Sequence, residues 1–391
     1  MAPKGQPKDF GFGPDEEMLR DVAKQFLDER LPVETLRQLV AEDHEGVYDR
    51  GEPTRWDAEL WKQVVELGWT GLGVSEAQGG VGVKLVGIAA LVEQVGHHAL
   101  PSPLLPTLHA TFVLREAGGD VAEAWLGRIA DGQATTLAFA DATGSWDPAR
   151  TGISARSEGD ELVLDGEALF VQDAFKCDQL LAVARQGDSL TLCMMATGAD
   201  GLELSRDQIH DLTRDQATVR FSGVRVPAAN VASGDGADAL RAAWPAVLTT
   251  VAADLCGSAE WQLQTTVKYA QDRKQFDRPL GFFQAVKHPL VDVMIAVDRA
   301  RSLVYHAACS IDSGTDDAEH AARMAKSAAS DAGAYASDRS VQLHGGIGFT
   351  WESDVHIFFK RSMHDQALYG DGVHHRKKLA NSILGPIGAT A

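Results

Sequence analysis

The spacing of apolar residues changes twice along the chain and divides it into three parts. From residue 15 to about residue 118 apolar side chains recur every three or four positions, as in Leu60, Val64 and Leu67, which is typical of amphipathic helices. Between about 135 and 231 the spacing shortens to two, and from about 239 the helical spacing returns. This pattern predicts a helical domain over 1–130, a β domain over 131–235 and a second helical domain over 236–391.

The β part also carries turn chemistry. An Asp165-Gly166 pair interrupts the apolar run between Leu162 and Val171, and such a pair between two strands is a strong signal for a β-hairpin. Further strands are expected at 180–184, 190–195 and 217–221, and Val224-Arg-Val-Pro227 closes the segment.

The last part predicts long helices that pack together. An apolar stripe follows Pro245 at spacings of three and four and consists of Leu248, Val251, Leu255, Ala259, Leu263 and Val267. Two more long helices are expected near 284–311 and 316–343. Long helices with broad apolar faces and short connections favour an antiparallel four-helix bundle, so the predicted fold class is α+β.

Composition narrows the classes of partner. The chain has 391 residues, of which 45% are apolar, and this suffices for a large core. Its formal charge of −19 disfavours nucleic acid as a partner, because no overall positive field attracts phosphate. The four cysteines lie far apart without a CxxC pair, so the sequence predicts no zinc site and no disulfide framework, and a reduced cytoplasm fits best. The N-terminus lacks a signal-peptide pattern, and no apolar run is long enough for a membrane span.

Two stretches near the C-terminal third are the most informative motifs. They read Arg273-Lys-Gln-Phe-Asp-Arg-Pro-Leu-Gly-Phe-Phe-Gln284 and Gln342-Leu-His-Gly-Gly-Ile-Gly-Phe-Thr-Trp-Glu352. Together they resemble the flavin-contacting segments of the acyl-CoA dehydrogenase family. The resemblance spans essentially the whole chain, and it implies a helical N-terminal domain, a middle β-barrel domain and a C-terminal four-helix bundle.

The same resemblance implies FAD as the cofactor. An arginine fork and backbone N–H groups bind a pyrophosphate well, and glycines let a backbone approach it closely. In the family these segments hold the FAD of a neighbouring subunit, so a homo- or heterotetramer is expected. The matching positions here are Arg273, Gln275, Phe276, Gln284, Gln342, Gly345 and Gly346.

Two residues of the β part take the place beside the flavin ring. The family usually has a tryptophan and a threonine there, and this chain has Phe170 and Gln172. Phe170 can pack on the flavin, or it is strand core. Gln172 can donate or accept a hydrogen bond as threonine would.

The family's catalytic glutamate is missing. It normally follows an aromatic residue and removes the α proton of the thioester while the β hydride passes to flavin N5. Here the matching segment is Tyr369-Gly370-Asp371-Gly372, so the position itself is Gly370. Asp371 is one candidate base, since glycines on both sides let the loop shift. Asp254 on the first bundle helix is a weaker candidate, whose alternative interpretation is a paired buried carboxylate.

Two further interpretations need no base in this chain. The first is a partner subunit in a mixed tetramer, in which one subunit supplies the base and the other completes the FAD site. The second is an FAD-containing lyase that acts on a CoA ester without net oxidation. The glycine-rich loop followed by a basic run at 374–378 fits the partner subunit, although such a run is often only a solvated helix end.

The expected partners are therefore an acyl-CoA substrate and an electron-transfer flavoprotein, as the family implies. The sequence does not reveal the chain length or ring character of the acyl group. His344 has no ligand-type neighbour at metal-binding spacing, so no metal is assigned.

Overall fold

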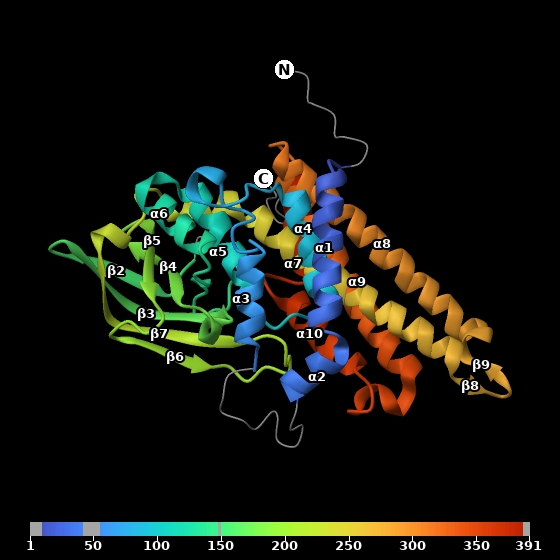
Figure 1. Cartoon of the computed structure of the whole chain (residues 1–391). Helices are drawn as coiled ribbons and strands as arrows, with labels where there is room; N and C mark the ends of the chain where they lie inside the picture. The colour runs from blue at the N-terminus through green and yellow to red at the C-terminus, as the bar shows by residue number, and fades with distance from the viewer. Residues whose placement is uncertain (1–9, 42–54, 148–149, 386–391) are drawn as a thin grey trace.

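The computed structural model describes residues 10–41, 55–147 and 150–385. Helices, a sheet and long helices follow one another along the chain, and Figure 1 shows the sheet at one end of the molecule and the long helices α8 and α9 reaching toward the other. The α+β fold class with this order of domains is confirmed. The prediction that the N-terminus lacks a signal peptide concerns residues 1–9, which lie outside the described residues.

The first part is entirely helical among the described residues. Its 3₁₀ turn η1 (Glu76–Gln78) lies in the glycine-rich loop that precedes α4. Asp57 starts α3 by accepting hydrogen bonds from the backbone N–H groups of Glu59 and Leu60, which satisfies donors that a helix leaves free at its N-terminus. The α-helices are α1 (Pro14–Arg30), α2 (Val33–Ala41), α3 (Ala58–Glu66), α4 (Leu85–His97), α5 (Leu104–Ala117) and α6 (Gly119–Ala130).

The middle part is a seven-stranded sheet. Its hydrogen-bonded order is β1-β4-β2-β3-β7-β6, and β5 pairs with β4 beside this path. The strands are β1 (Thr135–Ala138), β2 (Ile153–Glu158), β3 (Glu161–Gln172), β4 (Gln179–Gln186), β5 (Ser189–Ala196), β6 (Leu202–Arg206) and β7 (Gln216–Pro227). Short 3₁₀ turns follow β3 and β7, namely η2 (Ala174–Lys176) and η3 (Ala228–Asn230).

The hairpin predicted at Asp165-Gly166 is wrong. β3 runs through this pair without a turn, and the chain reverses instead between β2 and β3, where Glu158 pairs with Glu161. The register of β3 against β7 shifts at Asp165, and a side chain at Gly166 would collide with the backbone oxygen of Gly152. The glycine thus serves a bulge and a close strand contact, which a turn motif in the sequence does not distinguish from a hairpin.

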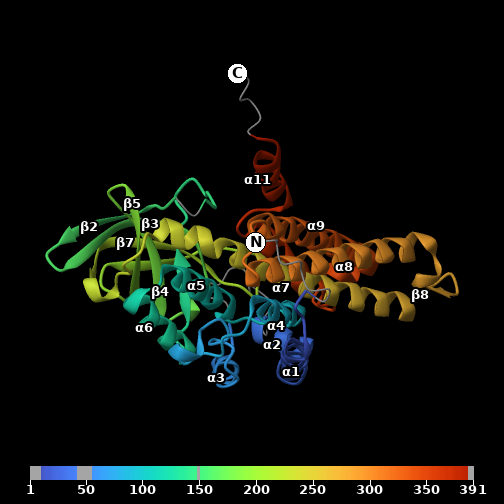
Figure 2. The ribbon, with the colours of Figure 1, turned by 90° about the horizontal axis from the view of Figure 1, so that it is seen from above.

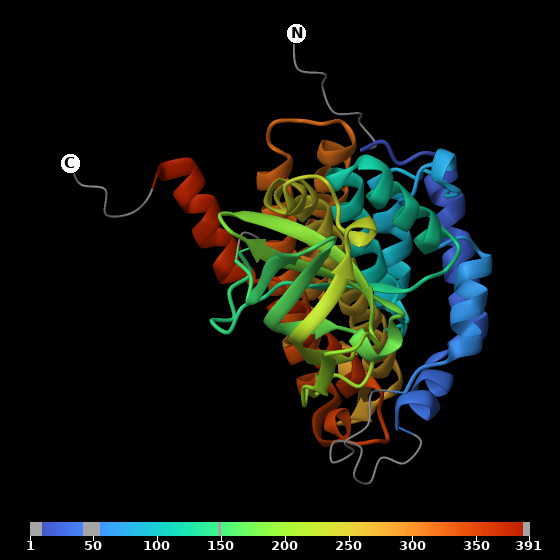
Figure 3. The ribbon, with the colours of Figure 1, turned by 90° about the vertical axis from the view of Figure 1, so that its left-hand side faces the viewer.

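Long helices make up the last part. They are α7 (Gly236–Asp272), α8 (Gln284–Asp312), α9 (Ala318–His344), α10 (Val355–Ala367) and α11 (Gly372–Leu384). The small hairpin β8 (Lys274–Gln275) and β9 (Arg278–Pro279) joins α7 to α8, with η4 (Leu280–Phe282) after it, and η5 (Gly345–Phe349) follows α9. Figure 2 shows α8 and α9 alongside α7, and Figure 3 shows α11 projecting from the body.

The first and last parts share one core because α4 and α7 cross at backbone contact. A side chain at Gly96 would collide with the backbone of Asp254, and one at Gly257 would collide with the backbone of Glu93. Glycines allow this approach because they carry no Cβ. Within the described residues, no helix combines the length and hydropathy that a membrane crossing requires.

Candidate functional site

Aromatic side chains fill the place where the first part, the sheet and the bundle meet. Tyr369, which follows α10, lies at ring-centroid distances of 5.0 Å from Trp244 on α7, 5.3 Å from Trp146 and 6.3 Å from Phe139. Trp146 in turn lies 5.4 Å from Phe170 on β3. We refer to these five residues as the aromatic cluster. Spacings of this size are those of favourable aromatic pairs.

The aromatic cluster holds two strained backbone positions. Phe170 and Tyr369 both have φ of 58°, a left-handed conformation that bulky residues rarely adopt. Such strain persists only where the surroundings over-determine it. Beside the cluster, the space between Leu105, Gln172 and Leu368 leaves no room for a water molecule. The rings of the cluster therefore pack on one another where the three parts of the chain meet.

Gly370, at the position of the family's glutamate, could carry a side chain only if His374 moved. Its φ is 101°, and a Cβ there would lie 2.5 Å from Cδ2 of His374. His374 comes from the first turn of α11 and is half-buried. The imidazole thus occupies the volume next to Gly370, and burial lowers the pKa of His374.

Asp371, the first candidate base, lies at the N-terminus of α11. Its Oδ1 accepts a hydrogen bond of 2.7 Å from the backbone N–H of His374, and the residue is exposed. This is the geometry of a helix N-cap. A base for carbon acids needs a desolvated position beside the substrate, and the geometry offers Asp371 a capping role instead.

We expect Asp371→Ala to lower the free energy of unfolding by about 1 kcal/mol, because one capping hydrogen bond is lost. In an assembly that carries FAD, flavin reduction by acyl-CoA should not change. Urea denaturation measures the first quantity, and anaerobic bleaching of the flavin band measures the second. Asp371→Asn, which keeps a capping oxygen, is the matched control. Loss of bleaching in both variants at unchanged stability would instead identify Asp371 as the base.

Asp254, the second candidate base, is the centre of a buried ion network. Its two oxygens accept hydrogen bonds from Arg214 at 2.8 Å and from Arg361 at 2.7 and 3.2 Å. Arg214 also bonds to Asp365 at 3.3 Å, and Arg361 bonds to the hydroxyl of Thr213 at 2.8 Å. Burial raises the pKa of Asp254 to about 6, while the two guanidinium groups favour its charged form. Such a network ties the loop between β6 and β7 to α7 and α10.

Gln172 is engaged within the chain. Its amide nitrogen donates to the backbone oxygen of Phe170 at 2.9 Å and to Gln216 Oε1 at 3.0 Å, and its oxygen lies 2.8 Å from Nε2 of His364. Both N–H donors are used, and only 4% of the residue is exposed. The contact with a flavin ring that the sequence predicts for Gln172 would require this arrangement to open.

The other predicted flavin contacts lie at the far end of the bundle. Arg273 and Gln275 are exposed at the β8–β9 hairpin, Phe276 at its tip is 87% exposed, and the exposed Gln284 opens α8. In Figure 1 this hairpin lies at the opposite end of the molecule from the seven-stranded sheet. One copy of the chain therefore keeps its two sets of predicted flavin contacts apart.

The second motif lies at the same end of the bundle as the hairpin. His344 ends α9 and stacks on Tyr269 near the end of α7, with ring centroids 4.2 Å apart. Gly345 and Gly346 follow it, and among the described residues nothing lies within 4 Å of a Cβ placed at either of them. Phe349 is 71% exposed, and Gln342, half a turn before His344, is exposed as well. These groups form an open surface that a second molecule could cover.

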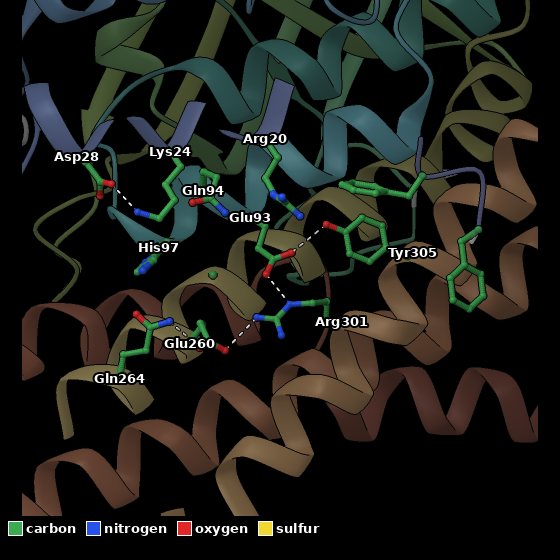
Figure 4. A pocket seen from close by; sticks show the side chains of 13 residues that line it. Arg20, Lys24, Asp28, Glu93, Gln94, His97, Glu260, Gln264, Arg301 and Tyr305 are labelled. Atoms are coloured by element: carbon green, nitrogen blue, oxygen red, sulfur yellow. Dashed lines mark hydrogen bonds and ion pairs between the residues drawn. The ribbon is translucent and has the colours of Figure 1, made fainter. Parts of the chain in front are cut away.

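A cavity of about 710 Å³ lies elsewhere, between α1, α4, α7 and α8. Figure 4 shows its charged walls, in which Arg301 bonds to Glu93 at 2.6 Å and to Glu260 at 3.0 Å. Lys24 pairs with Asp28 in the same wall. Since these charges neutralise one another, the described lining offers no uncompensated cation to a CoA phosphate, and we do not place the acyl-CoA site there.

The sequence alone does not reveal the aromatic cluster or the arginine network. Trp146 and Trp244 belong to a loop and to a helix that are distant in sequence, and neither has a motif around it. Arg214 and Arg361 look like surface residues in the sequence, yet they are 2% and 0% exposed. The one signal in the sequence is Trp244, which directly precedes Pro245 on the same helix as the candidate base Asp254.

Comparisons with known proteins agree with this architecture. The family model described as acyl-CoA dehydrogenase, N-terminal domain, matches residues 13–133, and the C-terminal domain model matches residues 246–384. The acyl-CoA dehydrogenase IpdE2 of Mycobacterium tuberculosis is 30% identical over 347 residues, which are 88% of this chain and 90% of that protein.

Solved structures share the fold over nearly the whole chain. A variant of the steroid ACAD Tcur3481–Tcur3483 is 28% identical with a TM-score of 0.84, covering 95% of this chain and 98% of that one. Butyryl-CoA dehydrogenase from Megasphaera elsdenii has a TM-score of 0.84 at 23% identity, covering 96% of this chain and 100% of that one.

Proposed function

Because this chain belongs to the acyl-CoA dehydrogenase family, we propose that it acts in acyl-CoA dehydrogenation as the subunit of a mixed assembly that supplies no base. The observation that carries this proposal is the Gly370 position, where His374 fills the space beside the backbone. Neither candidate carboxylate is poised for proton abstraction, since Asp371 caps α11 and Asp254 is held by two arginines. The base then comes from the partner subunit.

The chain's own residues fit one half of an FAD site and not the other. Bound FAD supplies the hydride acceptor of the family's reaction. The ring-facing half is closed, because Phe170 packs on Trp146 and Gln172 uses both amide donors within the chain. The outer half is open, with Arg273, Gln275 and Phe276 exposed on the hairpin. We infer that this half holds the pyrophosphate end of a partner's FAD, with Gln284, Gln342, Gly345 and Gly346 beside it.

An apolar face on α8 supports association with a second chain. Val291, Met294 and Ile295 are 46%, 46% and 57% exposed, and a groove of about 280 Å³ lies beside them between α7 and α8. Contiguous exposed apolar surface usually marks a contact with another protein. A relative whose name pairs two chains, Tcur3481–Tcur3483, is a precedent for a mixed assembly and for a steroid-derived acyl group. Electron transfer to an electron-transfer flavoprotein follows as the family's usual last step.

Flavin content of the chain purified alone tests this proposal. We expect little or no bound FAD, and no bleaching of any bound flavin by a panel of straight-chain and steroid-derived acyl-CoA esters under anaerobic conditions. The assembly purified through a tag on this chain should contain a second family member, carry FAD and be bleached. One FAD per chain in the isolated protein, reduced by an ester, would contradict the proposal.

Arg273→Ala is expected to remove most of the FAD from that assembly, because an arginine fork on a phosphate contributes charge-assisted hydrogen bonds. The stability of the isolated chain should stay within about 0.5 kcal/mol, since the residue is exposed. Lys274→Ala, an exposed neighbour on the same hairpin, is the matched control. The ratio of flavin absorbance to protein absorbance after gel filtration measures the effect. Equal FAD content in both variants would place the pyrophosphate elsewhere.

A further inference from the structure

Lys326 is a fully buried lysine in the middle of α9. Its ammonium donates three hydrogen bonds, to the Ser330 hydroxyl at 3.0 Å and to the backbone oxygens of Gln366 and Gly370 at 2.9 Å each. An ammonium has three N–H donors and no acceptor. All three donors are thus used. Two of them bind backbone oxygens at the end of α10 and in the turn that follows it.

The two backbone oxygens belong to the end of a helix and to the turn after it. Gln366 lies in the last turn of α10, where carbonyl groups lack partners within the helix and carry partial negative charge. Gly370 closes a turn in which Tyr369 and Gly370 both have positive φ, and its backbone N–H donates to the oxygen of Ala367 at 3.0 Å. Lys326 therefore binds this turn at both of its ends.

The turn decides where Tyr369 lies. The Tyr369 side chain is 4% exposed and contacts Trp146 and Trp244 at ring-centroid distances of 5.3 and 5.0 Å. Its left-handed backbone is unfavourable by itself, so the position needs external support. The lysine provides it from a rigid neighbouring helix.

We propose that Lys326 is the positioning residue of this turn, which holds Tyr369 in the aromatic cluster. The lysine touches neither cofactor nor substrate and acts only through the turn. The inference holds whether the chain is a partner subunit or carries its own base, because it concerns the resting geometry of the chain. Its failure would leave the proposed function untouched.

Among the described residues, no carboxylate contacts the ammonium. Asp365 and Asp371 act on Lys326 only through their charge, and the neighbouring imidazoles of His374 and His375 are themselves kept neutral by burial. The partners of Lys326 are thus neutral oxygens, two of which have directions fixed by the backbone. Such partners make the lysine a geometric clamp on the turn rather than one half of an ion pair.

The test combines Lys326→Met with Tyr369→Leu. Methionine has similar volume and no donors, so the two backbone oxygens lose their partner. We expect Lys326→Met to speed amide hydrogen exchange at least tenfold in residues 366–372 and to reduce the near-ultraviolet circular dichroism of the clustered rings. In the Tyr369→Leu background, Lys326→Met should change the circular dichroism no further, because the lysine acts through that tyrosine.

Matched variants separate positioning from general loss of structure. Lys360→Met removes a half-buried lysine of α10 that lies 3.2 Å from Nδ1 of His356 and 5.5 Å from the ring centroid of Trp351, and it should leave both readouts unchanged. Lys326→Gln, which keeps two N–H donors, should restore part of the protection, and it replaces the methionine variant if that one does not fold. Additive losses of circular dichroism, or exchange that rises equally throughout α9 and α10, would overturn the proposal.

Discussion

Asp254→Ala is expected to destabilise the protein by about 3–5 kcal/mol, because removing one partner of a buried ion network leaves uncompensated charge. Arg214 and Arg361 are 2% and 0% exposed and share Asp254 as a partner. After the substitution, Asp365 still pairs with both guanidinium groups, but the buried network has lost one negative charge. Both arginines are buried where the loop before β7 meets α7 and α10. A loss of this size is a large fraction of the stability of an ordinary domain.

Urea denaturation of the purified variant measures this loss, and Asp254→Asn is the informative companion. The amide keeps an oxygen that can accept from one arginine, but it removes the negative charge, so we expect a smaller loss that is still well above that of Asp371→Ala. A folded Asp254→Ala variant with unchanged stability would show that the arginines find other partners. If an assembly containing it also lost flavin reduction, Asp254 would be the base after all.

The order of the three parts was predictable from the sequence because periodicity reports which side chains share a face. The stripe from Leu248 to Val267 identifies α7, although that helix begins earlier, at Gly236, and passes through Pro245. Asp235 caps its N-terminus by accepting from the backbone N–H of Ala237 at 2.8 Å. Because proline normally marks the beginning of a helix, Pro245 makes the sequence predict a start later than Gly236.

The candidate site was predictable only where a motif is local. Each of the two segments, around Arg273 and around Gly345, is a continuous stretch of sequence. The structure brings both of them to one end of the bundle. The aromatic cluster joins a loop, strand β3, the residue after β1, a residue after α10 and helix α7, so its members share no spacing. The steric overlap between a side chain at position 370 and His374 likewise depends on the rotation of α11, which places the His374 ring against Gly370. Packing of this kind becomes visible only when the elements are docked.

The segment at 374–378 shows the same limit. It reads as a basic helix end, yet it lies in the first turns of α11, where His375 is fully buried and His374 fills the space beside Gly370. Asp312 is a second example, since it looks like the start of a solvated acidic loop. Its carboxylate instead accepts hydrogen bonds from the backbone N–H groups of Leu85 and Val86, at 2.8 and 3.0 Å. Both cases serve contacts between parts of the chain that are far apart in sequence.

Stability is expected to depend on pH through Lys326. Burial lowers its pKa from 10.5 to about 7, so between these values the unfolded chain binds a proton that the folded chain does not. Stability rises with pH wherever the unfolded state binds more protons. The contribution of Lys326 should therefore raise the free energy of unfolding by about 1.4 kcal/mol per pH unit above pH 7. Below pH 7 the lysine is charged in both states, and its contribution should be flat.

The comparison with Lys326→Met isolates this contribution from all other titrating groups. Urea denaturation of both proteins between about pH 6 and about pH 9.5 should show a difference in stability that is constant at the acid end and grows in favour of the natural protein toward the alkaline end. Lys378→Met, which changes an exposed lysine of α11, should leave the profile unchanged. The neutral amine can still donate to Gln366 and Gly370 while accepting from Ser330, so the turn keeps its protection from hydrogen exchange throughout. Parallel profiles for the natural protein and Lys326→Met would mean that the lysine stays charged, and the turn would then be held by an ammonium at every pH tested.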